Sequence, residues 1–350
     1  MIDKLIFLYS FNGGEIDLPF EGKEIVYSHA VNFLLEDTYF YLLKLMVKTN
    51  MVKKVYVVSK CMETSHRFAG YGIYKYSNTM EILYVPNLAS IDNYVGNVDD
   101  TDLIWTRGTS PVWSNYLVRH STARKVLYNL AYLKGSAQEY DLIFADDDVR
   151  FKSLKRHPCA FPFIKPANEK IFFPLNVEKQ YDIISIGTIQ ELKGQLKIIK
   201  AARKLRKPLR LIFPGAIKDQ SYLKACRECS NGSLLTVEFP GVVTRQKLNM
   251  LINQSRLHVF ASRREQVPRV LMEVACAGVP SLVTDHIKGG GQNYITNNIG
   301  GICSEWFLAH YIKKALMGWN KSPRDEYMRK FSSTIALKKI QDAFRHMGWI

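Results

Sequence analysis

The chain has 350 residues, of which 47% are hydrophobic and 23% are charged, a composition typical of globular domains and not of disordered or fibrous chains. Its apolar runs are far shorter than the roughly 20 residues that a membrane-spanning helix needs, and the N-terminus begins with a predicted strand instead of a signal peptide. We therefore expect a soluble, cytoplasmic protein, and the length favours two domains.

The net charge of +16 lies mostly in the second half of the chain. Residues 176–324 contain 23 lysines and arginines against 10 aspartates and glutamates, a net charge of +13. Such a field attracts an anionic ligand. The aromatic residues are not interleaved with the basic ones as a nucleic-acid stacking platform requires, which argues against nucleic acid. A diphosphate ligand, with an anionic lipid surface or acceptor beside it, explains the charge more simply.

The six cysteines are scattered, and only Cys226 and Cys229 form a close pair. This pair lacks the second pair or the histidine that a zinc site needs, and it lies in a predicted helix. We expect reduced thiols and no metal there.

The first half alternates short apolar strands with helices, which predicts a parallel sheet covered on both faces and a Rossmann-like domain that lacks the G-x-G-x-x-G motif. The strand at 4–10 is followed by the glycine pair Gly13-Gly14, where the backbone can approach a ligand closely. The further strands are expected at 53–59, 81–85, 102–106, 125–130 and 140–145, and the helices at about 28–49 and 110–119.

Two polar groups follow strands of this first half, where open α/β sheets bind ligands. Arg107 can contact a phosphate or an acceptor, or pair with a nearby acidic residue. Asp146-Asp147-Asp148 can cap the helix predicted at 149–157, or hold a divalent cation on a diphosphate.

Prolines and lost periodicity mark a linker at 161–175, so we place a domain boundary near residue 170. Beyond it the alternation of strands and helices resumes. The strands are expected at 181–186, 209–213, 234–239, 257–261 and 280–284, and the helices at 195–207, 221–229, 244–254, 268–277, 305–318 and 324–346.

The helix at 268–277 carries the clearest functional signal. Its N-terminus favours a diphosphate near Val267–Val270, next to Arg263, Arg264 and Arg269. Glu273, in an otherwise apolar helix, can accept hydrogen bonds from ribose hydroxyls, and Glu265 from a sugar. The alternative is that Glu265 caps the helix and Glu273 forms a salt bridge in the core.

Glu265-x7-Glu273, followed by Ala-Cys-Ala-Gly278-Val-Pro280, resembles the E-x7-E signature of retaining glycosyltransferases of family 4. The resemblance implies the GT-B fold, in which two Rossmann-like parallel-sheet domains face a cleft. Residues 1–170 would form the acceptor-side domain, joined by a C-terminal helix at 324–350 that crosses back. Residues 171–323 would form the donor-binding domain.

The resemblance also implies roles for individual residues. The loop Gly187–Gly194 is similar to the G-R-L-x-x-x-K-G segment, in which Lys193 matches the lysine and Thr188 replaces the arginine. One of the three arginines near 263–269 would then supply the missing cation. Lys193 and Glu265 would be catalytic. The residues expected to bind the donor are Glu273, Gly13, Gly14, Gly187, Thr188, Gly241, Arg263, Arg264, Val267, Pro268, Arg269 and Val270.

The implied function is retaining, metal-independent transfer of a hexose, mannose from GDP-mannose as first choice, to a hydroxyl of a glycan, lipid or glycoprotein. No cofactor is implied, and the partners are the nucleotide-sugar donor and the acceptor, with a homodimer as a further option. Two alternatives stay open. One is a metal-dependent transferase that uses Asp146–Asp148, which resemble the DxD site of the GT-A fold. The other is a non-catalytic basic scaffold that binds nucleotide or nucleic acid.

Overall fold

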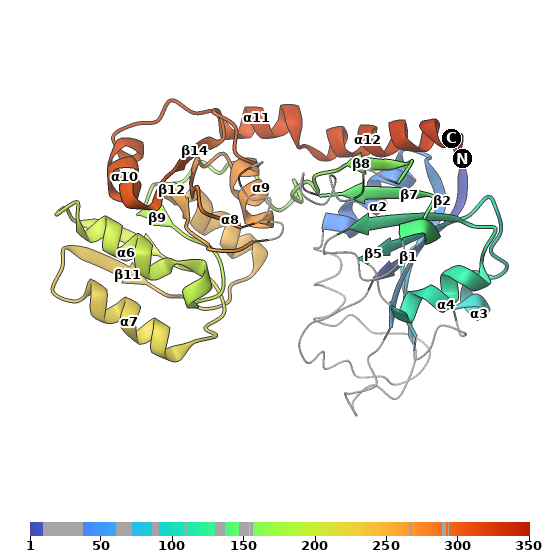
Figure 1. The fold of residues 1–350 in the computed structure, drawn as a ribbon, viewed down its shortest axis with the longest axis horizontal. Coiled ribbons are helices and arrows are strands. Elements are labelled where there is room, and N and C mark those ends of the chain that lie inside the picture. Colours follow the sequence, from blue (N-terminus) through green and yellow to red (C-terminus); the bar gives the residue numbers. More distant parts are fainter. Residues whose placement is uncertain are drawn as a thin grey trace. The chain divides into compact units, whose positions relative to one another are not determined.

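The chain forms two α/β units, each built on its own sheet (Figure 1). Unit 1 comprises Met1–Lys165 with Ala336–Ile350, and unit 2 comprises Pro166–Ile335. The α/β class with two parallel-sheet domains is therefore confirmed. The computed structural model describes residues 1–9, 38–60, 72–85, 91–108, 111–129, 137–146, 154, 157–265, 268–288, 292 and 294–350.

The described strands of unit 1 form one sheet in the order β3-β4-β2-β1-β5-β6-β7-β8. Every neighbouring pair is parallel except β3 with β4. The prediction of a wholly parallel sheet is wrong at this edge, because Asn78 and Thr79 alone separate the two strands and so short a connection allows only a hairpin. The strands are β1 Ile2–Tyr9, β2 Val52–Lys60, β3 Gly72–Ser77, β4 Met80–Val85, β5 Leu103–Arg107, β6 Arg124–Asn129, β7 Leu142–Ala145 and β8 Ala160–Pro162.

Helices pack on both faces of this sheet. Helix α2 (Thr38–Lys48) and the C-terminal helix α12 (Ser333–His346) contribute to one apolar cluster, together with the side chains of β1 and β5 that point to the same face. Helices α3 (Asp92–Val95) and α4 (Pro111–Arg119) contribute to a second cluster with the alternate residues of the strands. The sheet is therefore buried on both sides, as its nearly continuous apolar strands predict.

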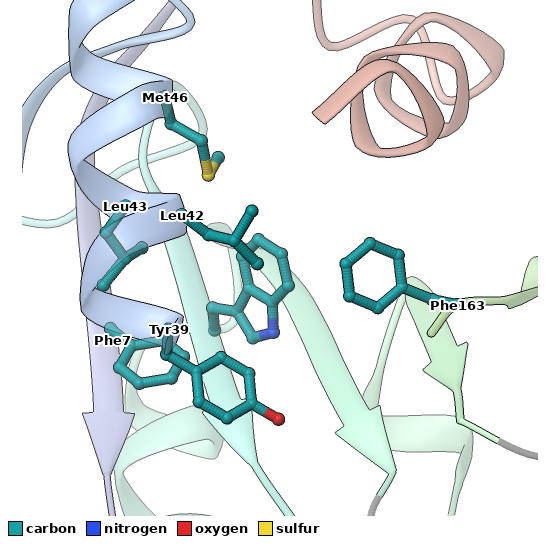
Figure 2. Close-up of a pocket in the computed structure, with 7 residues that line it drawn as sticks. Phe7, Tyr39, Leu42, Leu43, Met46 and Phe163 are labelled. Atoms are coloured by element: carbon teal, nitrogen blue, oxygen red, sulfur yellow. The ribbon is translucent and has the colours of Figure 1, made fainter. Parts of the chain in front are cut away.

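A small cavity lies between α2 and the sheet of unit 1 (Figure 2). Its volume is about 10 Å³, close to that of one water molecule. The lining side chains are predominantly apolar and come from α2, β1, β5 and the segment after β8. These are Phe7, Tyr39, Leu42, Leu43, Met46, Trp105 and Phe163. A void of this size and character is a packing gap in the core and not a substrate site.

The described strands of unit 2 form an all-parallel sheet in the order β11-β10-β9-β12-β13-β14. The strands are β9 Tyr181–Ile184, β10 Leu209–Ile212, β11 Leu235–Glu238, β12 Ser255–Phe260, β13 Ser281–Thr284 and β14 Gly300–Cys303. From β9 the chain proceeds to one side of the sheet, and from β12 it proceeds to the other. The strand order therefore reverses between β9 and β12.

This reversal explains why helices cover both faces of the unit 2 sheet, since right-handed crossovers that run in opposite directions place their helices on opposite faces. Helices α6, α7 and α10 share an apolar cluster on one face, and α8 and α9 cover the other (Figure 1). The bounds are α6 Gln195–Arg203, α7 Gln220–Ser230, α8 Arg245–Asn253, α9 Arg269–Cys276 and α10 Leu308–Leu316, with short 3-10 helices η3 Glu191–Lys193 and η5 Glu305–Phe307.

The prediction of one continuous helix at 324–346 is wrong. The structure has two helices, α11 (Pro323–Lys330) and α12, separated at Phe331 and Ser332. The Glu169 carboxylate accepts hydrogen bonds from the Ser333 backbone N–H and from its hydroxyl, both at 2.7 Å. A distant carboxylate therefore caps the start of α12. From Ala336 onward α12 belongs to unit 1.

The five described cysteines are free thiols. Burial raises the pKa of Cys226, Cys276 and Cys303 to about 12, so these three are protonated at neutral pH. No helix in the described part of the chain combines the length and the apolar character needed to cross a membrane.

Glu326, in α11, makes the stability of unit 2 sensitive to acid. Burial alone would raise its pKa, but hydrogen bonds from Arg329, Lys330 and Thr296 outweigh burial and hold the pKa at about 2. A carboxylate whose pKa is lower in the folded than in the unfolded chain stabilises the fold above the unfolded value of 4.5. That contribution, at most about 3 kcal/mol, is lost as the pH falls toward 2.

We expect Glu326→Gln to lower the free energy of unfolding at pH 7 and to flatten its decrease between pH 4.5 and pH 2. Urea denaturation at a series of pH values measures both effects. Glu228→Gln, at an exposed carboxylate of α7, is the matched control and leaves the pH profile unchanged. Identical profiles for wild type and Glu326→Gln would contradict this account.

Candidate functional site

The carboxyl ends of β9 and β12 lie side by side at the point where the strand order of unit 2 reverses. In open α/β sheets the loops diverge at such a point and leave a crevice in which ligands bind. The loop after β9 contains residues 185–194, and the loop after β12 begins at Ala261. Both predicted catalytic residues lie in these two loops.

Glycines set the path of the first loop. Gly194 has φ +75°, in the left-handed region, and a Cβ there would lie 2.3 Å from the Ala261 carbonyl oxygen. Gly187 has φ +153°, and the aliphatic stem of Lys193 passes over it. Gly215, at the end of β10, comes so close that a Cβ would lie 2.0 Å from the Gly187 oxygen. Only glycine allows these backbones to approach one another.

Backbone hydrogen bonds then join the loops after β9, β12 and β13. Arg263 donates its backbone N–H to the Leu192 oxygen at 2.9 Å. Glu265 donates to the Lys288 oxygen, and Lys288 donates to the Arg263 oxygen, both at 3.0 Å. The position of Glu265 is therefore determined by main-chain contacts to both neighbouring loops.

The structure brings Lys193 and Glu265 together in an ion pair between Nζ and Oε2. Each side chain is about one-fifth exposed, so the pair lies at the surface of the crevice and is accessible to a ligand. Glu265 is 72 residues from Lys193 in the sequence. The side chain of Glu265 thus faces the loop after β9. Its observed contact is with Lys193, which differs from the alternative in which it only caps the next helix.

Helix α9 starts one residue later than predicted. Pro268 is its N-cap residue, outside the helix, and Arg269 and Val270 form its first turn. Among the described residues, the N-cap Pro268 provides no side-chain cap. Its backbone N–H groups are therefore suited to an anion.

Glu273 lies in α9 and forms an ion pair with Arg245 at 3.2 Å, as the salt-bridge alternative predicts. The side chains are 13% and 17% exposed, so the pair is mostly shielded from water. Arg245 was missed by sequence reasoning. It starts α8, 28 residues before Glu273, and no spacing rule connects the two. Arg245 fixes the direction of the Glu273 carboxylate.

Comparison with known proteins agrees with this geometry. Residues 167–334, nearly all of unit 2, match the family model described as Glycosyl transferases group 1. A search among curated proteins gives no significant match. Similar solved structures include sucrose-phosphate synthase from Thermosynechococcus elongatus, with 14% identity, a TM-score of 0.70 and 99% coverage of both chains. The fold is that of the GT-B glycosyltransferases.

Two further GT-B structures resemble the whole chain. A glycosyltransferase from Rickettsia africae has 15% identity and a TM-score of 0.68, covering 99% of this chain and 98% of the other. Anabaena HepE, solved in complex with UDP and glucose, has 12% identity and a TM-score of 0.64, covering 98% of this chain and 100% of the other. At these identities the likeness concerns the fold alone.

The loop after β9 has Thr188 where the family resemblance leads us to expect a second cation, and Arg263 is one candidate to supply it. Thr188 accepts a hydrogen bond on its hydroxyl from Gln190 at 2.8 Å, so it serves the local loop structure. Arg263 pairs with Glu191 at 2.8 Å and thus lies against η3, beside Lys193. Arg264 is held through its backbone in a bridge to Lys288. The Arg263 side chain therefore contacts this loop directly.

The loops after β10 and β11 lie at the same carboxyl edge of the unit 2 sheet. Gly215 donates its N–H to the Gly241 oxygen at 2.8 Å, and Gly241 has φ +75°. Ile217 and Val242 follow these glycines and are exposed apolar side chains. The sequence analysis did not single them out.

The remaining predicted residues lie elsewhere. Gly13, Gly14 and Val267 fall outside the described residues, as do Asp147 and Asp148. In unit 1, Arg107 packs over the Tyr39 ring at 5.4 Å, and Lys165 over the same ring at 4.0 Å. Asp146 is buried at the end of β7. Within the described ranges, no three His, Cys, Asp or Glu side chains gather closely enough to hold a metal ion.

We expect Gly194→Ala to destabilise unit 2, because the new Cβ is strained at φ +75° and meets the Ala261 backbone. The loss should exceed about 2 kcal/mol in the free energy of unfolding. Gly232→Ala is the matched control, since Gly232 has φ +63° but nothing within 4 Å of a Cβ. Gly232→Ala should lower the free energy of unfolding by about 1 kcal/mol, because only the strained backbone conformation contributes. Equal losses in chemical denaturation would contradict the close approach of the two loops.

Proposed function

We propose that the protein is a glycosyltransferase that binds a nucleotide-diphosphate sugar at the carboxyl edge of the unit 2 sheet. The observation that carries the proposal is the meeting of Lys193 and Glu265 where the strand order reverses. The family match over residues 167–334 and the GT-B fold of the whole chain support it.

The diphosphate would lie between Lys193 and the N-terminus of α9. Lys193 and the backbone N–H groups at the start of α9 would stabilise the charge that develops on the departing diphosphate. We assign Arg263 as the second cation in place of the threonine at 188, because it already lies beside η3. Binding there requires Arg263 to exchange Glu191 for phosphate.

The two glutamates would hold the sugars of the donor. Glu265 would accept hydrogen bonds from the hydroxyls of the transferred hexose, and Glu273 from the ribose, with Arg245 orienting its carboxylate. Gly187, Gly215 and Gly241 would let the backbone approach the nucleotide. No divalent cation and no cofactor take part in this proposal, and transfer proceeds with retention of configuration.

The ion pair between Lys193 and Glu265 has a mechanistic consequence. Without ligand each group neutralises the other. In the complex Lys193 would turn to the phosphates and Glu265 to the hexose. Their mutual contact is thus replaced by two contacts to the donor, and both groups are placed next to the bond that breaks.

The donor is proposed as a hexose nucleotide, with GDP-mannose as the first candidate. UDP-glucose is the second, since UDP and glucose are bound in the Anabaena HepE structure. The acceptor would be a hydroxyl group of a glycan, lipid or glycoprotein.

Two substitutions separate the roles of the pair. Lys193→Met should abolish both nucleoside diphosphate binding and turnover, because it removes the cation that holds the phosphates. Glu265→Gln should lower turnover by about 100-fold but leave nucleoside diphosphate affinity equal or higher, because it removes a sugar contact and releases Lys193. Turnover of GDP-mannose and of UDP-glucose is measured as release of nucleoside diphosphate. The affinities for GDP and UDP are measured by calorimetric titration.

Lys224→Met, at an exposed lysine of α7, is the control and should behave as wild type. All assays are repeated with EDTA and with magnesium. Turnover that needs magnesium and is lost in Asp146→Asn would overturn the proposal in favour of the acidic cluster. Wild-type turnover in both Lys193→Met and Glu265→Gln would also overturn it.

A further inference from the structure

A second surface of unit 2 combines exposed aromatic and basic side chains. We name it the η5–α10 surface. It consists of Trp306, Phe307, His310, Lys313, Lys314 and Met317, all of which are exposed. Trp306 is 91% exposed, Phe307 62% and Met317 76%. Soluble surfaces rarely leave three large apolar side chains this open on one short segment, so the segment is a candidate for interaction.

The η5–α10 surface is presented from a firmly packed base. Leu308 and Ile312, on the opposite side of α10, are fully or almost fully buried in the core of unit 2. Glu305, which precedes Trp306, forms an ion pair with Lys197 of α6, and its carboxylate lies 3.1 Å from His286 Nε2. The exposed residues are therefore the outer face of an anchored helix and cannot turn inward without disrupting the core.

The charged side chains of the η5–α10 surface are all basic, and the neighbouring Glu305 is paired with Lys197. Helix α10 and the residues that follow it to Lys321 contain no aspartate or glutamate. Helix α6 lies beside α10 and shares its apolar cluster (Figure 1). Helix α6 also lacks acidic residues, and it exposes further basic ones together with its C-cap residue. These are Lys200, Arg203 and Lys204. A partner for this surface must therefore be negatively charged and able to take up apolar side chains.

We propose that the η5–α10 surface docks the protein on an anionic lipid bilayer. Trp and Phe prefer the boundary between headgroups and acyl chains, and lysines beside them contact anionic headgroups. Trp306 and Phe307 are adjacent and are not interleaved with Lys313 and Lys314, which argues against a single-stranded nucleic acid that stacks its bases along a basic track. A symmetric contact between two copies would bring Lys313 and Lys314 close to their own copies, which is unfavourable.

Vesicle binding tests this proposal without reference to catalysis. We expect the full chain to sediment with vesicles that contain phosphatidylglycerol and not with vesicles of phosphatidylcholine alone. Trp306→Ser with Phe307→Ser should weaken binding at least about tenfold, because the inserted apolar area is lost. Lys313→Gln with Lys314→Gln should weaken it by roughly 30-fold, and added salt should have a similar effect.

Matched controls carry the same chemical changes elsewhere in unit 2. Leu234→Ser removes another exposed apolar side chain, and Lys224→Gln with Arg227→Gln removes two charges from α7. Both should bind as wild type. Brominated lipids should quench the fluorescence of the wild type, and Trp306→Phe should lose that quenching, which detects insertion even if the double variant folds poorly.

Several results would overturn the proposal. One is failure of the wild type to bind anionic vesicles, and another is an equal loss in the controls. A third is a dimer in sedimentation velocity that Trp306→Ser with Phe307→Ser dissociates, since the surface would then bind a second copy. A fourth is binding to a polynucleotide that competes with the vesicles. None of these outcomes bears on donor binding at Lys193, so the two proposals fail separately.

Discussion

The candidate site depends on one constraint, the close approach of the loops that leave β9 and β12. Gly194 packs against the Ala261 carbonyl, where any side chain would clash, and the Arg263 amide bonds the Leu192 carbonyl. These contacts lie at the one place in the sheet of unit 2 where the strand order reverses. The ion pair of Lys193 and Glu265 is a consequence, because each residue is within one or two positions of a fixed backbone contact.

Many features of unit 2 could be predicted from the sequence where they depend on residues close together in the chain. The apolar strands of unit 2 end in glycine or polar loops, so the elements that carry Lys193, Glu265 and Glu273 follow from pattern. The role of Lys193 was inferred from the resemblance to glycosyltransferase family 4. The reversal that brings Lys193 to Glu265 follows from the predicted order of strands only once the GT-B fold is assumed. Contact between the two side chains was not predicted.

The rest could not be predicted, because it depends on residues far apart in the chain. The partner of Glu273 is Arg245, on another helix, and both are ordinary charged residues in their local sequences. The break between α11 and α12 depends on Glu169, whose carboxylate bonds Ser333 from 164 residues away. The hairpin of β3 with β4 was missed because β3 alternates tyrosine with polar residues and has no apolar run. Tertiary contacts decide such features.

The location of the donor site is the central claim, and hydrogen–deuterium exchange measures it most directly. The amides of residues 187–194, 261–265 and 269–271 are followed in the full chain with and without saturating nucleoside diphosphate and EDTA. We predict slower exchange in these three segments at the carboxyl edge of unit 2. Unchanged exchange there, with slower exchange around Asp146 in unit 1 when magnesium is added, would contradict the account.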